Sequence, residues 1–255
     1  SHVVTALQRR ENMRIRRSST IIICLVLLAQ VAAQPFGNAQ KILDGFQFVE
    51  GPAVDKNGDL YFTDIPPRLI YMFDGDTATV FMGSTWGANG LAFDPQGRLI
   101  ACAGKERRCI FRLEKDGTRT ILADSYDGKK LNSPNDLWID PNGGIYFTNP
   151  RYGSQDNMEQ DGMHVYYLAP GVSKLVRVIN DLERPNGIFG TPDGKILYVV
   201  DEGARKTWRY QIESPGVVSD KSLFCDSSIL ISREYEEMRL ASLQAIGYSL
   251  TAAAH

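Results

Sequence analysis

Four polar residues stand at equivalent points of a repeated sequence unit, and their side chains could bind a hard cation together. They are Glu50, Asn89, Asn135 and Asn186. Carboxylate and amide oxygens are the ligands that Ca²⁺ takes in proteins. If the fold brings the four side chains to one point, we expect a site for a hard cation there.

The repeated unit is clearest in residues 131–149. Its polar residues 133–136 precede an apolar strand at 137–139, and the tetrapeptide Asp-Pro-Asn-Gly at 140–143 then makes a tight turn. Proline pre-sets φ at the second position of such a turn, and glycine supplies a positive φ at its end. A second strand follows at 145–148. This pattern predicts a β-hairpin with a polar residue just ahead of its first strand.

Four copies of the unit recur at a spacing of roughly 40–50 residues. They cover residues 50–64, 89–101, 131–149 and 186–201. Each of the first three is followed by a second hairpin with a DG or PG turn. A period of this size with four strands per unit is typical of a β-propeller. We therefore predict an all-β propeller of antiparallel four-stranded blades. The first strand of each blade would line a central channel, and the four polar residues, called mouth residues below, would converge there.

Five motifs carry a resemblance to a known family. They are Glu50-Gly-Pro52, Ala88-Asn-Gly-Leu91, Leu131-Asn-Ser-Pro-Asn-Asp136, Phe147-Thr-Asn-Pro-Arg-Tyr-Gly153 and Arg184-Pro-Asn-Gly187. Together they resemble the senescence-marker-protein/gluconolactonase family, whose members are calcium-dependent lactonases built as six-bladed β-propellers. The resemblance runs from about Lys41 to Asp226 and is greatest to the exported bacterial gluconolactonases.

The resemblance implies a role for individual residues. Glu50 matches the carboxylate that binds the metal from the first blade, and Asn135 and Asn186 match two amide ligands. Asn89 and Tyr152 are implied to bind the substrate, Tyr152 from a loop that covers the pocket. The implied cofactor is calcium, and the implied partner is a small-molecule lactone.

Two departures from the family pattern affect this expectation. Asn149 stands where the family usually has Asp, which should alter the hydrogen bonding of the local loop. The family's fourth metal ligand is an Asp in a Pro-Asp-Gly motif that also serves as general base, and the matching sequence ends at Asp226 before this motif arrives. We therefore assign no catalytic residue. We expect a chain truncated after about four blades, an open arc of blades, weak calcium binding and little turnover.

Lactone hydrolysis requires a polarised carbonyl, an activated water and a stabilised leaving alkoxide. A divalent ion can supply the first and the third as a Lewis acid, and a carboxylate beside it can take the proton of the water. The sequence contains no Gly-x-Ser-x-Gly element and no Ser/His/Asp arrangement, which argues against a serine hydrolase.

Several alternatives stay open at this level. The mouth residues could simply cap the first strands by Asx-type hydrogen bonds, and the Asn89-Gly90 dipeptide is common in turns. The same scaffold and metal chemistry would also suit a phosphotriesterase-like hydrolase. A non-catalytic propeller fragment or binding module, which lacks the blade that bears the base, is a third interpretation.

The ends of the chain differ from the repeats. A basic run at 13–17, an apolar run at 20–28 and small residues at 31–33 predict a cleavable export signal, since the apolar run is short for a membrane span. A membrane anchor or a buried strand is the alternative. We thus divide the chain into upstream residues and signal (1–33), propeller blades (34–226) and a tail outside the family pattern (227–255), in which 232–246 predict a helix.

Composition narrows the partners and the compartment. The net charge is −2 with a pI of about 6.0, and no basic stripe is present, so we expect no nucleic acid partner. After signal cleavage we expect a periplasmic or secreted protein without a membrane segment. Cys102 and Cys109 could form a disulfide across a hairpin in such a compartment, or remain as free thiols, because spacing alone does not place their Cβ atoms.

Overall fold

The computed structural model describes residues 41–229, and nearly all of its regular structure is β-strand. Every strand belongs to one unit that begins at Gly45. The predicted signal at 1–33 and the predicted helix at 232–246 lie outside the described residues. Within the described part of the chain, no helix has the length and apolar character needed to cross a membrane.

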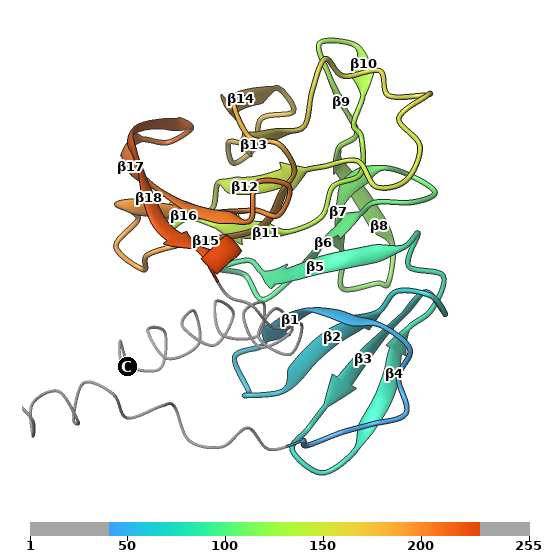
Figure 1. Ribbon diagram of the computed structural model, residues 1–255. Coiled ribbons are helices and arrows are strands. Elements are labelled where there is room, and N and C mark those ends of the chain that lie inside the picture. Colours follow the sequence, from blue (N-terminus) through green and yellow to red (C-terminus); the bar gives the residue numbers. More distant parts are fainter. Residues whose placement is uncertain (1–40, 230–255) are drawn as a thin grey trace, which may run out of the picture. The chain divides into compact units, whose positions relative to one another are not determined.

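Four antiparallel sheets contain four strands each, and within each sheet the strands lie side by side in sequence order (Figure 1). The first sheet contains β1 (Val49–Val54), β2 (Leu60–Asp64), β3 (Leu69–Phe73) and β4 (Ala78–Met82). The second contains β5 (Ala88–Phe93), β6 (Leu99–Ala103), β7 (Cys109–Leu113) and β8 (Arg119–Ala123). The third contains β11 (Leu137–Ile139), β12 (Ile145–Asn149), β13 (His164–Leu168) and β14 (Leu175–Ile179). The fourth contains β15 (Pro185–Gly190), β16 (Ile196–Asp201), β17 (Lys206–Ser214) and β18 (Val217–Asp226).

Two smaller elements complete the described chain. A two-stranded hairpin joins the second and third sheets through β9 (Ser125–Tyr126) and β10 (Lys129–Lys130). A single 3₁₀ turn, η2 (Ser227–Ile229), follows β18. The prediction of four consecutive antiparallel blades is therefore confirmed. The open arc stays a prediction, because its closure depends on residues outside 41–229.

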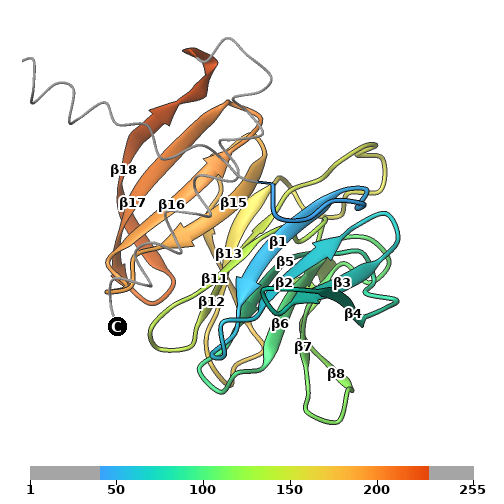
Figure 2. The ribbon, with the colours of Figure 1, turned by 90° about the horizontal axis from the view of Figure 1, so that it is seen from below.

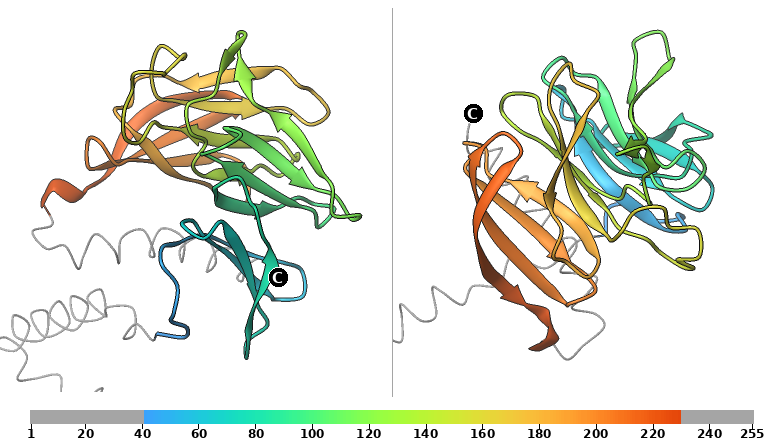
Figure 3. Two further views of the ribbon diagram at one scale, coloured as in Figure 1. Left: turned by 90° about the vertical axis from the view of Figure 1, so that its right-hand side faces the viewer. Right: turned by 90° about the horizontal axis from the view of Figure 1, so that it is seen from above.

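The first strands of the four sheets face one another, and the fourth strands lie outward (Figure 2). In sequence order, β1 contacts β5, β5 contacts β11, and β11 contacts β15. In both views of Figure 3, the sheet of β1–β4 and the sheet of β15–β18 lie at opposite ends of the series. This arrangement gives the four mouth residues neighbouring positions on neighbouring strands.

The hairpin turns form as the sequence predicts. In the third sheet, the Asp140 carboxylate accepts hydrogen bonds from the N–H groups of Asn142 (2.8 Å) and Gly144 (2.9 Å). Gly143 has φ of 85°, a conformation that a side chain would strain. Asp55 and Asp94 accept equivalent bonds in the first two sheets. These aspartates are structural turn residues.

The hydrophobic core lies between successive sheets. One cluster joins Ile110 of the second sheet to Phe147 and Tyr166 of the third. A second cluster packs the first sheet on the second, and a third packs the third sheet on the fourth. Each fully buried side chain of this size stabilises the fold by roughly 1.5–3 kcal/mol relative to exposure. Face-to-face packing of this kind fixes the sheets relative to each other and so fixes the channel.

The two neighbouring cysteines are free thiols, which decides between the alternatives left by the sequence. Cys102 on β6 pairs in register with Ile110, and Cys109 on β7 pairs with Ala103. Cys102 packs between the second and third sheets, whereas Cys109 packs between the first and second. Their side chains therefore project from opposite faces of one sheet and cannot meet.

Candidate functional site

The four mouth residues lie at the same end of adjacent first strands. Glu50 is on β1, Asn89 on β5 and Asn186 on β15, while Asn135 lies two residues ahead of β11. Asn89 is inside its strand rather than in a turn, so the turn interpretation of the Asn89-Gly90 dipeptide is wrong.

Side-chain hydroxyls and backbone groups connect these residues in order around the channel. Thr63 Oγ1 donates to the carbonyls of both Glu50 (3.0 Å) and Asn89 (3.2 Å). The N–H of Gly90 donates to the carbonyl of Asn135 (2.7 Å). The bonds to the carbonyls of Asn89 and Asn135 run between neighbouring sheets, whereas the bond to the carbonyl of Glu50 lies within the first sheet.

Thr148 repeats the role of Thr63 at the boundary between the third and fourth sheets. Its Oγ1 donates to the carbonyl of Asn186 (2.5 Å) and accepts from the N–H of Asp136 (3.1 Å). Both threonines are fully buried and stand one residue before the end of the second strand of their sheet. A threonine at this position therefore fixes the backbone of the mouth residue in the following sheet.

Glycine follows the mouth residue in three of the four copies, and at two of them, Gly51 and Gly90, the neighbouring chain approaches too closely for a side chain. A Cβ atom on Gly51 would lie 2.0 Å from the carbonyl oxygen of Asn89. A Cβ atom on Gly90 would lie 2.5 Å from Asp136 Oδ1. The mouth residues are thus held by tight backbone packing, and their side chains are left available for chemistry.

Asn135 is largely buried and Glu50 is partly buried, and neither side chain is fully hydrogen-bonded. Asn135 is 7% exposed, and its side-chain amide has no hydrogen-bond partner among residues 41–229. Burial raises the pKa of Glu50, and a hydrogen bond from the Gly51 N–H opposes that shift. Buried carboxylates and amides in this condition are costly unless a partner or a cation satisfies them. This donor set, one carboxylate and several amide oxygens, fits a hard cation.

Asp136 is a second carboxylate at the channel, and the sequence analysis assigned it no role. Its Oδ1 accepts from the N–H of Leu137 (2.9 Å), and its Oδ2 accepts from the N–H of Ile188 (3.0 Å) on β15. Burial raises the pKa of Asp136 to about 7, these two hydrogen bonds oppose the shift, and the charge of Glu50 adds to it. Glu50 stands near the start of β1 and Asp136 directly ahead of β11, and both strands contact β5. The signal available in the sequence was the position of Asp136 directly beside Asn135.

Among the described residues, no three or more His, Cys, Asp or Glu side chains lie together in a way that could hold a metal. The expected site differs from such clusters because its further ligands are asparagines. The roles of Glu50, Asn135 and Asn186 as ligands therefore stay a prediction, as does the role of Asn89 at the substrate.

Tyr152 lies in the long loop between β12 and β13 and reaches across to the fourth sheet. Its hydroxyl accepts a hydrogen bond from Asn186 Nδ2 (2.5 Å), while 42% of the residue remains exposed. Burial of the hydroxyl raises the pKa of Tyr152 to about 12, against the effect of the Asn186 bond, so the phenol stays protonated at neutral pH. The loop thus contributes a polar group beside Asn186, and the role of Tyr152 at the substrate stays a prediction.

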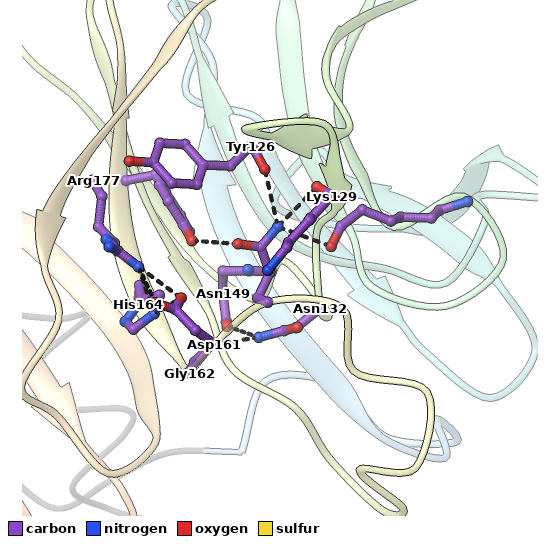
Figure 4. A network of polar contacts seen from close by, with 11 residues as sticks. Tyr126, Lys129, Asn132, Asn149, Asp161, Gly162, His164 and Arg177 are labelled. Carbon is purple, nitrogen blue, oxygen red and sulfur yellow. Dashed lines mark hydrogen bonds and ion pairs between the residues drawn. The ribbon is translucent and has the colours of Figure 1, made fainter.

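The far half of this loop is anchored by a polar network (Figure 4). Gln160 is 4% exposed, donates to the carbonyl of Lys129 (2.8 Å) and accepts from the Tyr166 hydroxyl (3.1 Å). Asp161 pairs with Arg177 through both carboxylate oxygens (2.7 and 2.9 Å). These contacts attach the loop to the β9–β10 hairpin and to β14, which limits how far its near half can move.

Asn149 makes one of the two hydrogen bonds that its counterparts make. At the same position, Asp64 accepts from two successive backbone N–H groups ahead of β1, and Asp201 does so ahead of β15. Asn149 accepts only from the N–H of Ser133 (3.0 Å), and its buried Nδ2 has no partner in the described structure. An amide cannot replace both carboxylate oxygens as acceptors. The predicted change in local hydrogen bonding is therefore present.

Known proteins are similar to this chain in sequence and in fold. Residues 48–229 match the family described as the SMP-30/Gluconolactonase/LRE-like region. The chain belongs to this family. A gluconolactonase of Zymomonas mobilis is 30% identical over 225 residues, which covers 79% of this chain and 62% of the relative.

Solved structures agree with the family assignment. A gluconolactonase of Xanthomonas campestris is 33% identical with a TM-score of 0.65 and covers 71% of this chain and 63% of that one. Regucalcin of Agrobacterium tumefaciens, named as a calcium-binding protein, shares the fold with a TM-score of 0.59 and 21% sequence identity. The match covers 74% of this chain and 62% of the regucalcin chain. The chain spans about three fifths of the length of the family members it matches.

Proposed function

We propose that the four sheets carry the channel site of a lactonase that hydrolyses a sugar lactone with the help of a divalent cation. The observation that supports it most directly is the set of desolvated oxygen donors at the channel, the Glu50 carboxylate and the Asn135 amide. The gluconolactonase names of the relatives from Zymomonas and Xanthomonas support the substrate class.

Glu50, Asn135 and Asn186 would hold the cation, and calcium suits an all-oxygen set best. When bound, the cation supplies Lewis-acid polarisation of the ester carbonyl and stabilises the leaving alkoxide. Asn89, on the strand between those of Glu50 and Asn135, would contact the substrate. Neutral amide donors would leave much of the cation's charge uncompensated, which favours this role.

Asp136 is the candidate proton acceptor for the attacking water. Each of its oxygens accepts one backbone hydrogen bond, so each keeps a free lone pair. Those bonds hold the carboxylate rigidly beside Asn135, as general-base catalysis requires. We also propose export, on the basic and apolar runs within residues 13–28.

A pH-stat assay with gluconolactone on the full chain, with and without added calcium, tests the proposal. We expect slow hydrolysis that depends on calcium and that the Glu50→Gln substitution lowers by at least about 10-fold, since even loss of a group supporting a metal ligand costs about that much. Glu213→Gln, an exposed substitution at the end of β17, is the matched control and should leave the rate unchanged.

Hydrolysis that survives both a chelator and Glu50→Gln would contradict the metal-dependent mechanism. Calcium binding without turnover of any lactone would favour a binding module instead. Turnover of a phosphotriester in place of the lactone would point to the related hydrolase chemistry on the same scaffold.

A further inference from the structure

An asparagine that binds a cation must present its oxygen and not its nitrogen. The two atoms end the same planar amide, and only the oxygen has lone pairs to donate. A half-turn about the last side-chain bond exchanges them. Something must therefore hold the Asn186 amide in one orientation before a cation arrives.

In the structure, the Asn186 amide is oriented with its nitrogen toward Tyr152. Its Nδ2 donates to the Tyr152 hydroxyl at 2.5 Å, and its Oδ1 has no hydrogen-bond partner among residues 41–229. Its backbone carbonyl is held separately by Thr148 Oγ1 at 2.5 Å. Both contacts come from the third sheet and its loop, across the boundary to the fourth. The amide nitrogen is therefore occupied, and the oxygen is left free.

Tyr152 is itself held in place by two residues next to the strands of the fourth sheet, Arg184 directly before β15 and Glu202 directly after β16. The Arg184 guanidinium lies over the Tyr152 ring, 5.7 Å from its centre. Arg184 is in turn paired with Glu202 (Nε to Oε2, 2.5 Å). A ring fixed by this stack and by an anchored loop can place its hydroxyl without help from a bound substrate.

We propose that Tyr152 is a positioning residue: its hydroxyl holds the Asn186 amide nitrogen and so directs the Asn186 oxygen toward the cation. This role differs from the substrate contact that the family resemblance implied. It rests on the proposed function only for the presence of a cation, because the orientation of the amide is a property of the chain without metal. The hydroxyl acts through Asn186, not on the cation.

Calcium titration calorimetry on the full chain measures the consequence. Tyr152→Phe keeps the ring and its stack on Arg184 but removes the acceptor. We expect it to weaken calcium binding about 10-fold, the usual lower range for loss of a group that orients a metal ligand. Tyr198→Phe is the matched control, since Tyr198 is a half-buried tyrosine of the fourth sheet that packs on Phe224 away from the mouth, and it should change nothing.

A double-mutant cycle with Asn186→Asp separates positioning from direct contact. A carboxylate has two equivalent oxygens, so its orientation does not matter to the cation. In the Asn186→Asp background, Tyr152→Phe should therefore change calcium affinity less than 2-fold. An equal loss in both backgrounds would overturn the proposal and indicate that Tyr152 acts on the cation or on the fold.

A readout without metal keeps this proposal distinct from the proposed function. The two side-chain amide protons of Asn186 give an NMR signal whose shift and exchange rate report the bond to Tyr152. We expect Tyr152→Phe to move that signal and speed its exchange, and Tyr198→Phe to leave it alone. An unchanged signal would refute the positioning role even if calcium binds. If calcium does not bind the wild type, the metal-dependent function fails while the amide signal still decides the orientation.

Discussion

The buried threonine of the third sheet offers the most direct test of how the mouth residues are held. Thr148→Val has nearly the same shape as the native residue but removes the hydroxyl. The Asn186 carbonyl then loses its donor at 2.5 Å, and the Asp136 N–H loses its acceptor at 3.1 Å. Because Thr148 is fully buried, water cannot replace either partner.

The expected cost follows from these two groups. Leaving a buried donor or acceptor unsatisfied costs about 1–3 kcal/mol each, so we expect a loss of about 2–6 kcal/mol in the free energy of unfolding. For a chain of this size, 1 kcal/mol corresponds to about 2–4 °C, so the melting temperature should fall by at least about 4 °C and at most about 24 °C. Scanning calorimetry measures this shift.

Two further variants sharpen the test. Thr79→Val, on an exposed position of β4, should change the free energy of unfolding by less than about 0.5 kcal/mol. Thr63→Val should behave like Thr148→Val, since Thr63 donates to the carbonyls of Glu50 and Asn89. A Thr148→Val protein that melts within about 1 °C of the wild type would refute the view that these hydroxyls fix the channel backbone.

Two other outcomes follow from the buried polar groups. Asn149→Asp should raise the free energy of unfolding by about 1 kcal/mol in urea titration, because a carboxylate can accept the second backbone hydrogen bond that Asp64 and Asp201 accept. A destabilised variant would show that the cost of burying the charge outweighs the added hydrogen bond. Burial raises the pKa of Cys109 to about 12, so the folded state keeps the neutral thiol while the unfolded chain ionises near pH 9. The contribution of this thiol to the free energy of unfolding should therefore be complete below about pH 9 and should be lost between about pH 9 and 12. In the native protein, peptide mass spectrometry should find Cys109 alkylated far more slowly than Cys225. Equal labelling of the two thiols would contradict the burial of Cys109.

Asp136 shows where sequence reasoning stopped. It stands next to Asn135 and carries an oxygen donor of similar size, so the pattern alone could not rank the two. Their difference depends on burial, on the N–H of Ile188 from another sheet and on the charge of Glu50, all of which are long-range. The bond from Asn186 to Tyr152 has the same character, since a loop of the third sheet meets a strand of the fourth.

The sequence by itself determined the elements. Hairpins depend on residues within a few positions of one another, so the turn at Asp140-Gly143 and the strands beside it could be predicted, and repetition then predicted four blades and a common position for Glu50, Asn135 and Asn186. Only the tertiary structure decided which faces those strands present. Cys102 and Cys109 are close in sequence yet project from opposite faces, because pairing register, set by packing between sheets, determines the direction of every side chain.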